Sequence, residues 1–407
     1  MAVNSLGAIW SCCSPDFGIV SVVNRFEQLN PDILLAHKRY SFNGKDYIQD
    51  KKIKELQIKL PSIKKTIVFD STFDSWILNS NFWIDFDFES VKFDLPIWVL
   101  FSSGTTGKPK AITHGTGGML LEQYKSHSLH QNIMNGDRFF WNTTTGWMMW
   151  NYAIGSFLCG ATLCLYDGSA NFPDVGVQWR FAKDAKINHF GNGSTLFIAS
   201  MKQNCKDVSN ENLKFIKTIG ATGSPLSIEA FKWLQKKLPS TQIISLSGGT
   251  DVCSAFIGGC PKLPVYAGFL QCNMLGASIK AWDENRKSIK GKTGELVITE
   301  PLPSMPVFFW GDENFKKYND SYFAEDQEVW THGDWIFIDE LRGVLMQGRS
   351  DATLNRNGIR IGTSEIYSVL DGIKEIKDSL IIDLNIDGSS KLILFVVTEK
   401  ELNKDFK

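Results

Sequence analysis

The sequence lacks a marked excess of either charge. Its 407 residues include 43 Lys and Arg and 44 Asp and Glu, for a formal net charge of -1. Binders of nucleic acid or of acidic membrane surfaces usually carry a positive excess, so neither kind of partner is expected. A long apolar run is also lacking, since the longest, 152–166, is too short to span a bilayer and contains Gly155 and Gly160. No signal peptide is visible at the N-terminus, so we expect a cytosolic protein without a membrane span.

Cysteines are few and are not spaced as metal ligands. None forms a Cys-x-x-Cys pair, and none precedes a His pair at zinc spacing. We therefore expect reduced, mostly buried thiols and no structural metal. The eight are Cys12, Cys13, Cys159, Cys164, Cys205, Cys253, Cys260 and Cys272.

What the sequence does contain is the composition of a globular protein. Hydrophobic residues make up 43% and charged residues 21%, which excludes disordered, collagen-like and disulfide-scaffold classes. At roughly 150 residues per domain, the length favours two to three domains.

The first hundred residues alternate between strand and helix patterns. Apolar runs at 33–36 and 66–69 predict strands, and 19–29 and 51–60 predict helices, the first capped by Asp16. This order predicts a parallel sheet with helical crossovers. Beyond residue 275 the runs become short and alternating, as in antiparallel structure, at 277–282, 294–299, 335–339 and 344–347. Further on, a helix is expected at 363–370 and strands at 379–384 and 391–397.

The strongest chemical signal is a nine-residue stretch, 102–110, directly after an apolar strand pattern at 96–101. Glycines let backbone N–H groups approach a ligand, hydroxyls donate hydrogen bonds and lysines add positive charge, so a polyphosphate is the expected ligand. It is not a Walker A loop, because Ser102 and Pro109 replace required residues. The alternative is a polar surface loop without function. The stretch reads Ser102, Ser103, Gly104, Thr105, Thr106, Gly107, Lys108, Pro109, Lys110.

This stretch resembles the phosphate-loop signature of the adenylate-forming superfamily, which includes the acyl-CoA synthetases. Further segments resemble that superfamily's adenine-contacting, Gly-x-Thr-Glu, ribose-holding and hinge segments, in the same order along the chain. They are Gly223-Ser224-Pro225, Gly248-Gly249-Thr250-Asp251, Thr331-His332-Gly333-Asp334, and Gly348-Arg349-Ser350-Asp351 with Asn357-Gly358-Ile359-Arg360. Within the superfamily the resemblance is closest to the acetoacetyl-CoA synthetases, through residues 7–10, 14–18, 143–151, 165–169 and 247–251.

The resemblance implies an α/β fold. It consists of a large N-terminal domain of parallel sheets with helices and a small β-barrel-like part, followed by a truncated small α+β C-terminal domain. The expected division is an AMP-binding (adenylation) domain over 1–348 that misses its start, a hinge at 349–351 with Asp351, and a partial C-terminal domain over 352–407. No segment matches the superfamily's adenylation lysine, and Lys400, Lys404 and Lys407 do not fit its pattern. Loss of such a group typically costs on the order of 10²–10³ in rate, so poor adenylation is expected.

The resemblance also implies roles at the phosphates. Thr250 would donate to the α-phosphate, Arg360 would lie near the phosphates, and Asp251 would be linked to Mg²⁺ in place of the family's Glu. Asp251 is one methylene shorter than Glu, which affects the expected metal geometry.

Other roles concern the sugar and coenzyme A. Asp334 would accept hydrogen bonds from the ribose hydroxyls, and Arg349 would contact the ribose. Gly358 would let the pantetheine arm of CoA pass close to the backbone. The alternatives are a turn carboxylate for Asp334, a surface side chain for either Arg349 or Arg360, and a simple turn for Gly358.

The acyl pocket is expected near two sites. Trp147 and Trp150 either line it or belong to the core. Gly248 stands where acetate-specific relatives carry a Trp that closes the pocket, so its small size would admit a four-carbon keto acid. His127 and His130 are expected to be packed or solvated side chains and not metal ligands.

The implied function is an ATP-dependent acid–CoA ligase in lipid and ketone-body metabolism. It would convert acetoacetate, ATP and CoA to acetoacetyl-CoA, AMP and pyrophosphate through an acyl-adenylate. The alternatives are a ligase for another short-chain carboxylic acid and an inactive nucleotide-binding fragment. The expected partners are these small molecules, and the oligomeric state stays open.

Overall fold

The computed structural model describes residues 1–70, 73, 77, 87–102, 108–350, 354–356, 359–361, 367, 370, 373, 375–386 and 389–399. The described residues form two compact units. The first comprises Met1–Phe181, Gly248–Ala255 and Leu302–Ser321, and the second Ala182–Ser247, Phe256–Pro301 and Tyr322–Lys407. The expected domain boundary at 349–351 stays a prediction.

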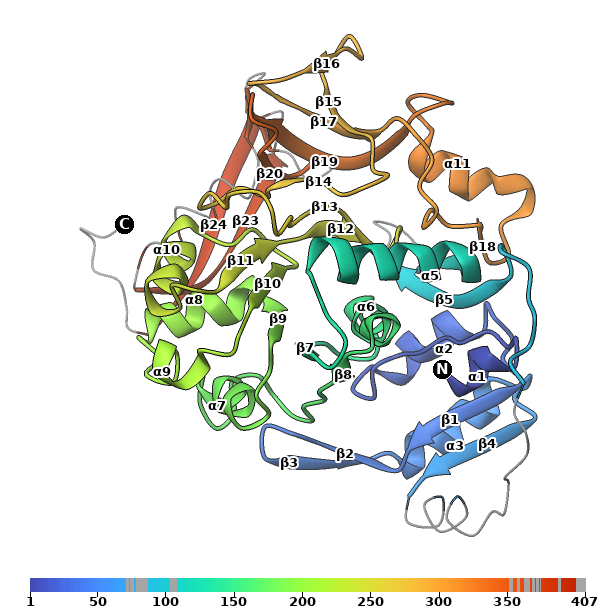
Figure 1. Cartoon of the computed structure of the whole chain (residues 1–407). Coiled ribbons are helices and arrows are strands. Elements are labelled where there is room, and N and C mark those ends of the chain that lie inside the picture. The colour runs from blue at the N-terminus through green and yellow to red at the C-terminus, as the bar shows by residue number, and fades with distance from the viewer. Residues whose placement is uncertain are drawn as a thin grey trace. The chain divides into compact units, whose positions relative to one another are not determined.

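The start of the first unit has the predicted parallel arrangement (Figure 1). β1 (Ile33–His37) pairs in parallel with β4 (Lys65–Phe69), and α3 (Asp50–Lys59) makes the crossover. A hairpin of β2 (Arg39–Phe42) and β3 (Lys45–Ile48) lies between β1 and α3. Its turn is Asn43-Gly44, and both residues have positive φ, 49° and 71°. α1 covers Ala2–Ser5 and α2 covers Ile19–Phe26. The predicted Asp16 cap of α2 is wrong, because Gly18 is the N-cap and no side chain caps the helix.

The core of this part is apolar and small. Val22 of α2, Leu34 of β1, and Leu56 and Leu60 in and after α3 form one buried cluster. Leu56 is 5% exposed, whereas Ile58 on the other face of the same helix is 80% exposed. The spacing of apolar residues in α3 therefore decides which face the helix buries.

A second part of the first unit holds the phosphate-stretch flanks. β5 (Pro96–Ser102) and β6 (Lys110–Gly115) are antiparallel, and their register pairs Ser102 with Lys110. β18 (Phe308–Phe309) pairs with the other edge of β6. The remaining elements are α5 (Thr116–Lys125), η1 (Ser126–His130), β7 (Arg138–Trp141), α6 (Met149–Gly155), η2 (Ser156–Cys159), β8 (Thr162–Leu163) and η3 (Glu313–Phe315). α7 (Val177–Asp184), β12 (Ser247–Gly249), β13 (Ser254–Gly258) and α11 (Lys316–Tyr322) run across the unit boundaries.

The second unit contains a parallel sheet. β9 (His189–Gly193), β10 (Thr218–Thr222) and β11 (Gln242–Ser245) are parallel, in the order β11-β10-β9. The connections hold α8 (Ser194–Lys202), α9 (Asn210–Leu213) and α10 (Ile228–Lys237). Ser227 begins α10 by accepting a hydrogen bond from the Ala230 N–H, and Ser209 caps α9 in the same way. The carboxyl ends of the three strands therefore meet at one edge.

The antiparallel part of the second unit also agrees with the sequence pattern. Its sheet has the order β16-β15-β17-β19-β20, so the expected barrel-like part is an open sheet in the described residues. Burial alternates along the whole of β19, as the sequence predicts for a strand with one buried face. The strands of this sheet are β15 (Ile279–Trp282), β16 (Ser288–Ile289), β17 (Thr293–Ile298), β19 (Trp330–Ile338) and β20 (Val344–Arg349), whereas β14 (Cys272–Asn273) pairs with β13 in a separate sheet.

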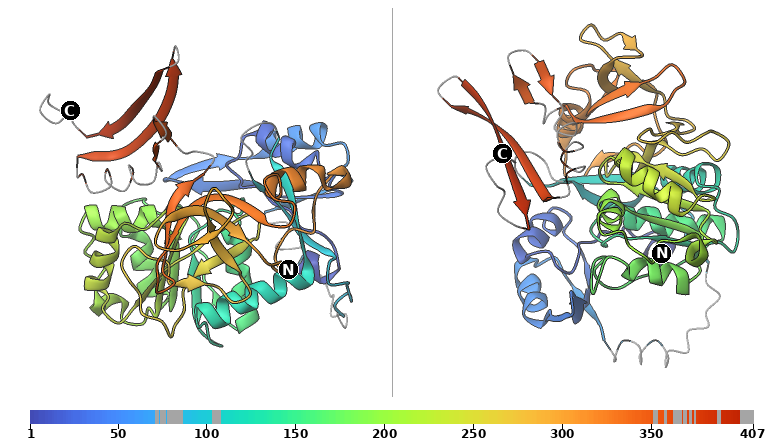
Figure 2. Two further views of the ribbon diagram at one scale, coloured as in Figure 1. Left: turned by 90° about the horizontal axis from the view of Figure 1, so that it is seen from above. Right: turned by 90° about the vertical axis from the view of Figure 1, so that its left-hand side faces the viewer.

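Two hairpins follow. β21 (Leu354–Arg356) pairs with β22 (Ile359–Ile361), and β23 (Ile376–Ile386) pairs with β24 (Ser389–Thr398). The two views of Figure 2 show β23 and β24 as one long twisted hairpin, drawn in red. The two strands expected at 379–384 and 391–397 are thus confirmed, and each is longer than predicted.

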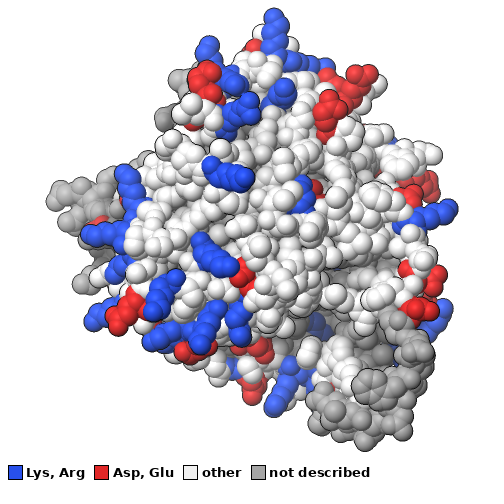
Figure 3. All heavy atoms as spheres, viewed as in Figure 1, with Lys and Arg blue, Asp and Glu red and all other residues white. Residues whose placement is uncertain are grey.

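The surface carries both charges. Figure 3 shows Lys and Arg scattered among Asp and Glu over one face, and basic side chains are most numerous where Figure 1 places α8, α9 and α10. Within the part of the chain that the structure describes, no helix is long and apolar enough to cross a membrane.

We predict that Leu56→Ala lowers the free energy of unfolding by about 2–5 kcal/mol, because it leaves a cavity in the cluster around α3. Ile58→Ala, a similar truncation on the exposed face of the same helix, should change it by less than about 0.5 kcal/mol. Denaturant unfolding of the three proteins measures both values. Equal losses in the two variants would show that α3 does not pack as described.

Candidate functional site

The ends of the phosphate stretch are anchored differently. The Ser102 hydroxyl is buried, and none of the described residues is its hydrogen-bond partner. Lys108 instead forms an ion pair with Glu27, with 2.8 Å between Nζ and Oε1 and side chains 60% and 38% exposed. An ion pair this exposed contributes little to stability, so Lys108 can exchange Glu27 for a phosphate at low cost. A buried hydroxyl at the strand end and lysines beyond it suit an anionic ligand.

Asp251 lies beside the last residue of that stretch. Lys110 Nζ is 3.9 Å from Asp251 Oδ1, and the two side chains are 30% and 20% exposed. Behind them, His114 Nε2 lies 3.0 Å from the Asp251 carbonyl oxygen. Burial lowers the pKa of His114 to about 4, so the ring is neutral at neutral pH and Nε2–H donates to the carbonyl. Lys110, the last residue of the predicted stretch, and the predicted carboxylate are thus brought together within one unit.

This arrangement suits Mg²⁺ held with nucleotide phosphates. Among the described residues no group of three or more His, Cys, Asp or Glu side chains could form a metal cage. Mg²⁺ does not need one, because it commonly binds through one or two carboxylates plus phosphate oxygens and water. The partly exposed Asp251 carboxylate would provide one such ligand, and Lys110 would provide a compensating positive charge beside it.

The backbone packs closely around Gly248, whereas the pocket hypothesis expects open space there. A Cβ at this position would lie 2.0 Å from the Ser254 carbonyl oxygen and 2.6 Å from the Ala255 Cα. A side chain there would meet the backbone of β13, so glycine is needed for strand packing itself. Gly248→Trp would therefore disturb the backbone, and the idea that Gly248 enlarges the acyl pocket gains no support from these contacts.

The Trp147 segment packs against the N-terminal segment that shares its resemblance. Thr145 Oγ1 donates to the Cys13 carbonyl oxygen at 3.3 Å, and a Cβ on Gly146 would lie 2.9 Å from Ser14 N. Trp147 itself is half-buried. Its role in an acyl pocket stays a prediction.

In the second unit, Asp334 and Arg349 are brought together. They are register partners in the β19–β20 pair, and Arg349 Nη1 is 3.9 Å from Asp334 Oδ1. His332 Nε2 lies 3.5 Å from Asp334 Oδ2, while Asp334 as a whole is 9% exposed. A carboxylate held between two nitrogen-bearing side chains has a fixed orientation and can accept hydrogen bonds from a diol.

Sequence reasoning missed Glu295 of β17, which connects these residues. Its Oε1 accepts hydrogen bonds from the Gly333 N–H and the Ser350 hydroxyl, each at 3.1 Å. Burial, helped by the nearby Glu325 and Asp334, raises the pKa of Glu295 to about 7 against the lowering effect of the two hydrogen bonds. The alternating pattern of β17 gives no sign that Glu295 has a special role, because its hydrogen-bond partners lie 38 and 55 residues away in the sequence.

The predicted adenine segment lies at the carboxyl edge of the parallel strands. Gly223 follows β10 with φ 87°, a left-handed conformation that favours glycine. Ser194 Oγ donates to the Ser224 carbonyl oxygen at 2.6 Å, and Thr222 Oγ1 donates to the Leu246 carbonyl oxygen at 2.8 Å. These bonds join the loops after three neighbouring strands, which is where open α/β sheets bind ligands.

The remaining predicted residues fall into two groups. Ser103, Gly104, Thr105, Thr106, Gly107, Asp351 and Gly358 lie outside the described residues, as does most of the helix expected at 363–370. Arg360 lies in β22, opposite Asn355 in the register. His127 and His130 are buried in η1, in keeping with the expected packed role.

We predict that Glu295 makes stability depend on pH. Its pKa is higher in the folded protein, about 7, than the ordinary value of 4.5. The stabilisation is therefore complete below about pH 4.5 and is lost as the pH rises through about 7. Glu295→Gln keeps an acceptor oxygen and cannot ionise, so the difference in unfolding free energy between wild type and variant should fall across that range. Denaturant unfolding at a series of pH values measures it, and two parallel curves would contradict the assignment.

The chain is similar to a known enzyme family and to several of its members. Residues 1–306 match the AMP-binding enzyme family. The chain is 39% identical to the acetoacetyl-CoA synthetase of Gallus gallus, covering 97% of this chain and 62% of that protein. It is also 39% identical to the acetoacetyl-coenzyme A synthetase of Rhizobium meliloti, covering 97% and 63%. The chain therefore spans less than two thirds of the length of the curated relatives it matches.

Solved structures agree. The acetoacetyl-CoA synthetase of Streptomyces lividans superposes with a TM-score of 0.93 at 38% identity, over 100% of this chain and 64% of that one. The anthranilate CoA ligase AuaEII, solved with anthranoyl-AMP, gives a TM-score of 0.82 at 19% identity, over 98% and 74%, and shows a shared fold. With its phosphate stretch, its paired Asp334 and Arg349 and these matches, the chain belongs to the AMP-binding enzyme family.

Proposed function

We propose that this protein is an acetoacetate–CoA ligase. The observation on which this depends most is the Asp251 carboxylate 3.9 Å from Lys110, at the end of the phosphate stretch. The likeness to acetoacetyl-CoA synthetases at 38–39% identity supports the choice of acyl group. ATP, CoA and acetoacetate are then its substrates, and Mg²⁺ accompanies ATP.

The first half-reaction joins the acid to AMP. A carboxylate oxygen of acetoacetate forms a bond to the α-phosphorus, and the bond from that phosphorus to the bridging oxygen of pyrophosphate breaks. Negative charge collects on the phosphate oxygens during this step, and electrostatic stabilisation there is commonly the largest contribution to catalysis. Lys110 and Thr250 would provide it from the protein, while Mg²⁺, when bound, neutralises phosphate charge next to Asp251.

The second half-reaction transfers the acyl group to CoA. The thiolate sulfur forms a bond to the acyl carbon, and the bond from that carbon to the AMP oxygen breaks, releasing AMP. Asp334 and Arg349 would hold the ribose throughout, and the segment 223–225 would lie along the adenine. Gly358 and Arg360 would serve at the pantetheine arm and the phosphates, and Asp351 as the hinge between the two steps.

We predict that Asp334→Asn weakens ATP binding by about 10–100-fold, because a hydrogen bond to a charged group contributes roughly 1.5–3 kcal/mol. Glu340→Gln removes an exposed carboxylate in the turn just after the same strand and should leave ATP binding unchanged. Calorimetric titration with ATP compares the three proteins. Equal affinities for wild type and Asp334→Asn would contradict the ribose assignment.

The acyl group is tested with a set of acyl-sulfamoyl adenosines, which resemble acyl-adenylates and do not react. We expect the acetoacetyl compound to bind tighter than the acetyl and propionyl compounds in competition with ATP. Tighter binding of another short acyl compound would favour the alternative ligase. Binding of ATP with no acyl preference would favour a nucleotide-binding fragment.

A further inference from the structure

The turn that carries Asp251 has an unusual backbone. Cys253, which is not glycine, has φ 46°, in the left-handed region that most side chains avoid. Its N–H donates to the Thr250 carbonyl oxygen at 3.2 Å, which closes the turn. Strained residues of this kind persist only where the surroundings fix them, and they cluster at functional sites. The contacts that fix this turn are therefore relevant to Asp251.

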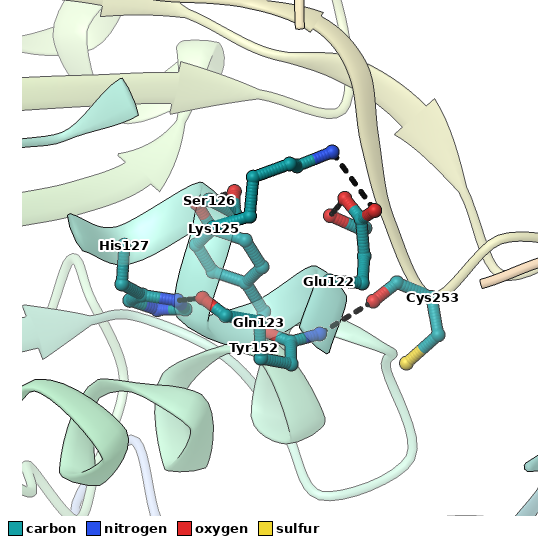
Figure 4. Close-up of polar contacts among 8 residues, drawn as sticks. Glu122, Gln123, Lys125, Ser126, His127, Tyr152 and Cys253 are labelled. Atoms are coloured by element: carbon teal, nitrogen blue, oxygen red, sulfur yellow. Dashed lines mark hydrogen bonds and ion pairs between the residues drawn. The ribbon is translucent and has the colours of Figure 1, made fainter. Parts of the chain in front are cut away.

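Two side chains of α5 hold the turn from outside. Gln123 Nε2 donates to the Cys253 carbonyl oxygen at 2.8 Å, and Ser254 Oγ donates to Glu122 Oε1 at 2.8 Å. Figure 4 shows Glu122 and Gln123 on the same helix, both on the side of the segment that carries Cys253. Both bonds join residues about 130 positions apart in the chain.

The Glu122 side chain is buried, and both of its carboxylate oxygens have partners. It is 2% exposed, Ser254 donates to Oε1, and Lys125 Nζ lies 2.8 Å from Oε2. A buried ion pair is a weak source of stability compared with apolar packing. It does give the carboxylate one orientation, and that orientation directs Oε1 at the chain after Cys253.

Gln123 is also restricted to one orientation. A Cβ on Gly155 would lie 2.6 Å from Gln123 Oε1, so only glycine leaves room for this amide. On the helix itself, His127 Nδ1 lies 2.8 Å from the Gln123 carbonyl oxygen. With its Oε1 packed against Gly155, the Gln123 amide nitrogen donates to the Cys253 carbonyl.

We propose that Glu122 and Gln123 are positioning residues that fix the turn 250–254 and so set where the Asp251 carboxylate stands relative to Lys110. The inference rests on the proposed function of Asp251. It assigns a role to two residues that contact the turn and are outside the residues predicted to bind nucleotide or metal.

The chain order supports this role. β6 begins at Lys110 and ends at Gly115, and α5 follows directly at Thr116. One continuous strand–helix segment thus supplies the lysine next to Asp251, the His114 contact to the Asp251 carbonyl, and the two α5 contacts to the turn. The separation between cation and carboxylate is consequently determined by this one segment.

The test compares Gln123→Leu with Gln131→Leu. Both replace a buried glutamine by an apolar residue of similar size, and each residue is 2% exposed. Gln131 Nε2 donates to the Tyr152 hydroxyl at 2.6 Å, so its amide is used by α6 and not by the turn. Two readouts are used on the full chain: the affinity for ATP with Mg²⁺ by calorimetry, and amide hydrogen exchange across 251–255.

Gln123→Leu should weaken MgATP binding by about 10–100-fold, the usual effect of removing an outer partner of a metal ligand. It should also speed exchange across 251–255, whereas Gln131→Leu should change neither readout beyond its effect on overall unfolding. Equal effects in the two variants would overturn the proposal.

If Gln123→Leu does not fold, Ser254 provides the second test. Ser254→Ala removes the donor to Glu122, and Ser254→Thr retains it, so Thr should restore the MgATP affinity that Ala loses. Equal affinities for Ala and Thr would overturn the proposal. Absence of MgATP binding by the wild-type chain would instead refute the proposed function, while hydrogen exchange would still decide the positioning role.

Discussion

The ion pair between Lys110 and Asp251 is the interaction on which this account depends. ATP chemistry requires a cation and a metal-binding carboxylate near the same phosphates. The two charges must not neutralise each other completely. At 3.9 Å, and with both side chains partly exposed, they attract each other weakly and both can bind a ligand. The carboxylate lies on a strained turn held by Glu122, Gln123 and His114, so its place is set by the fold.

In the second unit, too, the fold holds polar side chains in fixed places, here through strand register and loop hydrogen bonds. Asp334 is held by strand register opposite Arg349, and Glu295 joins the Gly333 backbone to Ser350 beside them. A sheet fixes facing residues well, because each strand position has one partner across the ladder. The loops after the parallel strands hold the other candidate segment at their carboxyl edge, through short bonds such as Ser194 to Ser224. In both units regular structure positions the polar groups.

Much of this could be predicted from the sequence, for identifiable reasons. Strands such as β19 and helices such as α3 have strong periodicity, and the resemblance identified Asp251, Asp334 and Arg349 as residues with a shared ligand. Glu122, Gln123 and Glu295 could not be found in this way, because a buried polar residue is recognisable only by partners far along the chain. The Asp16 cap failed because Gly18 begins α2 without any side-chain bond. The Gly248 pocket hypothesis stays a prediction, and the structure adds that a Cβ at Gly248 would meet the backbone of Ser254 and Ala255.

The most direct test of the central claim is anomalous diffraction from crystals grown with Mn²⁺ and a non-hydrolysable ATP analogue. Mn²⁺ prefers the same octahedral oxygen sites as Mg²⁺ and can be located by its scattering. The account predicts an anomalous peak at bonding distance, about 2.0–2.2 Å, from an Asp251 carboxylate oxygen, with triphosphate oxygens completing its shell beside Lys110. A metal and triphosphate bound away from Asp251 would contradict it.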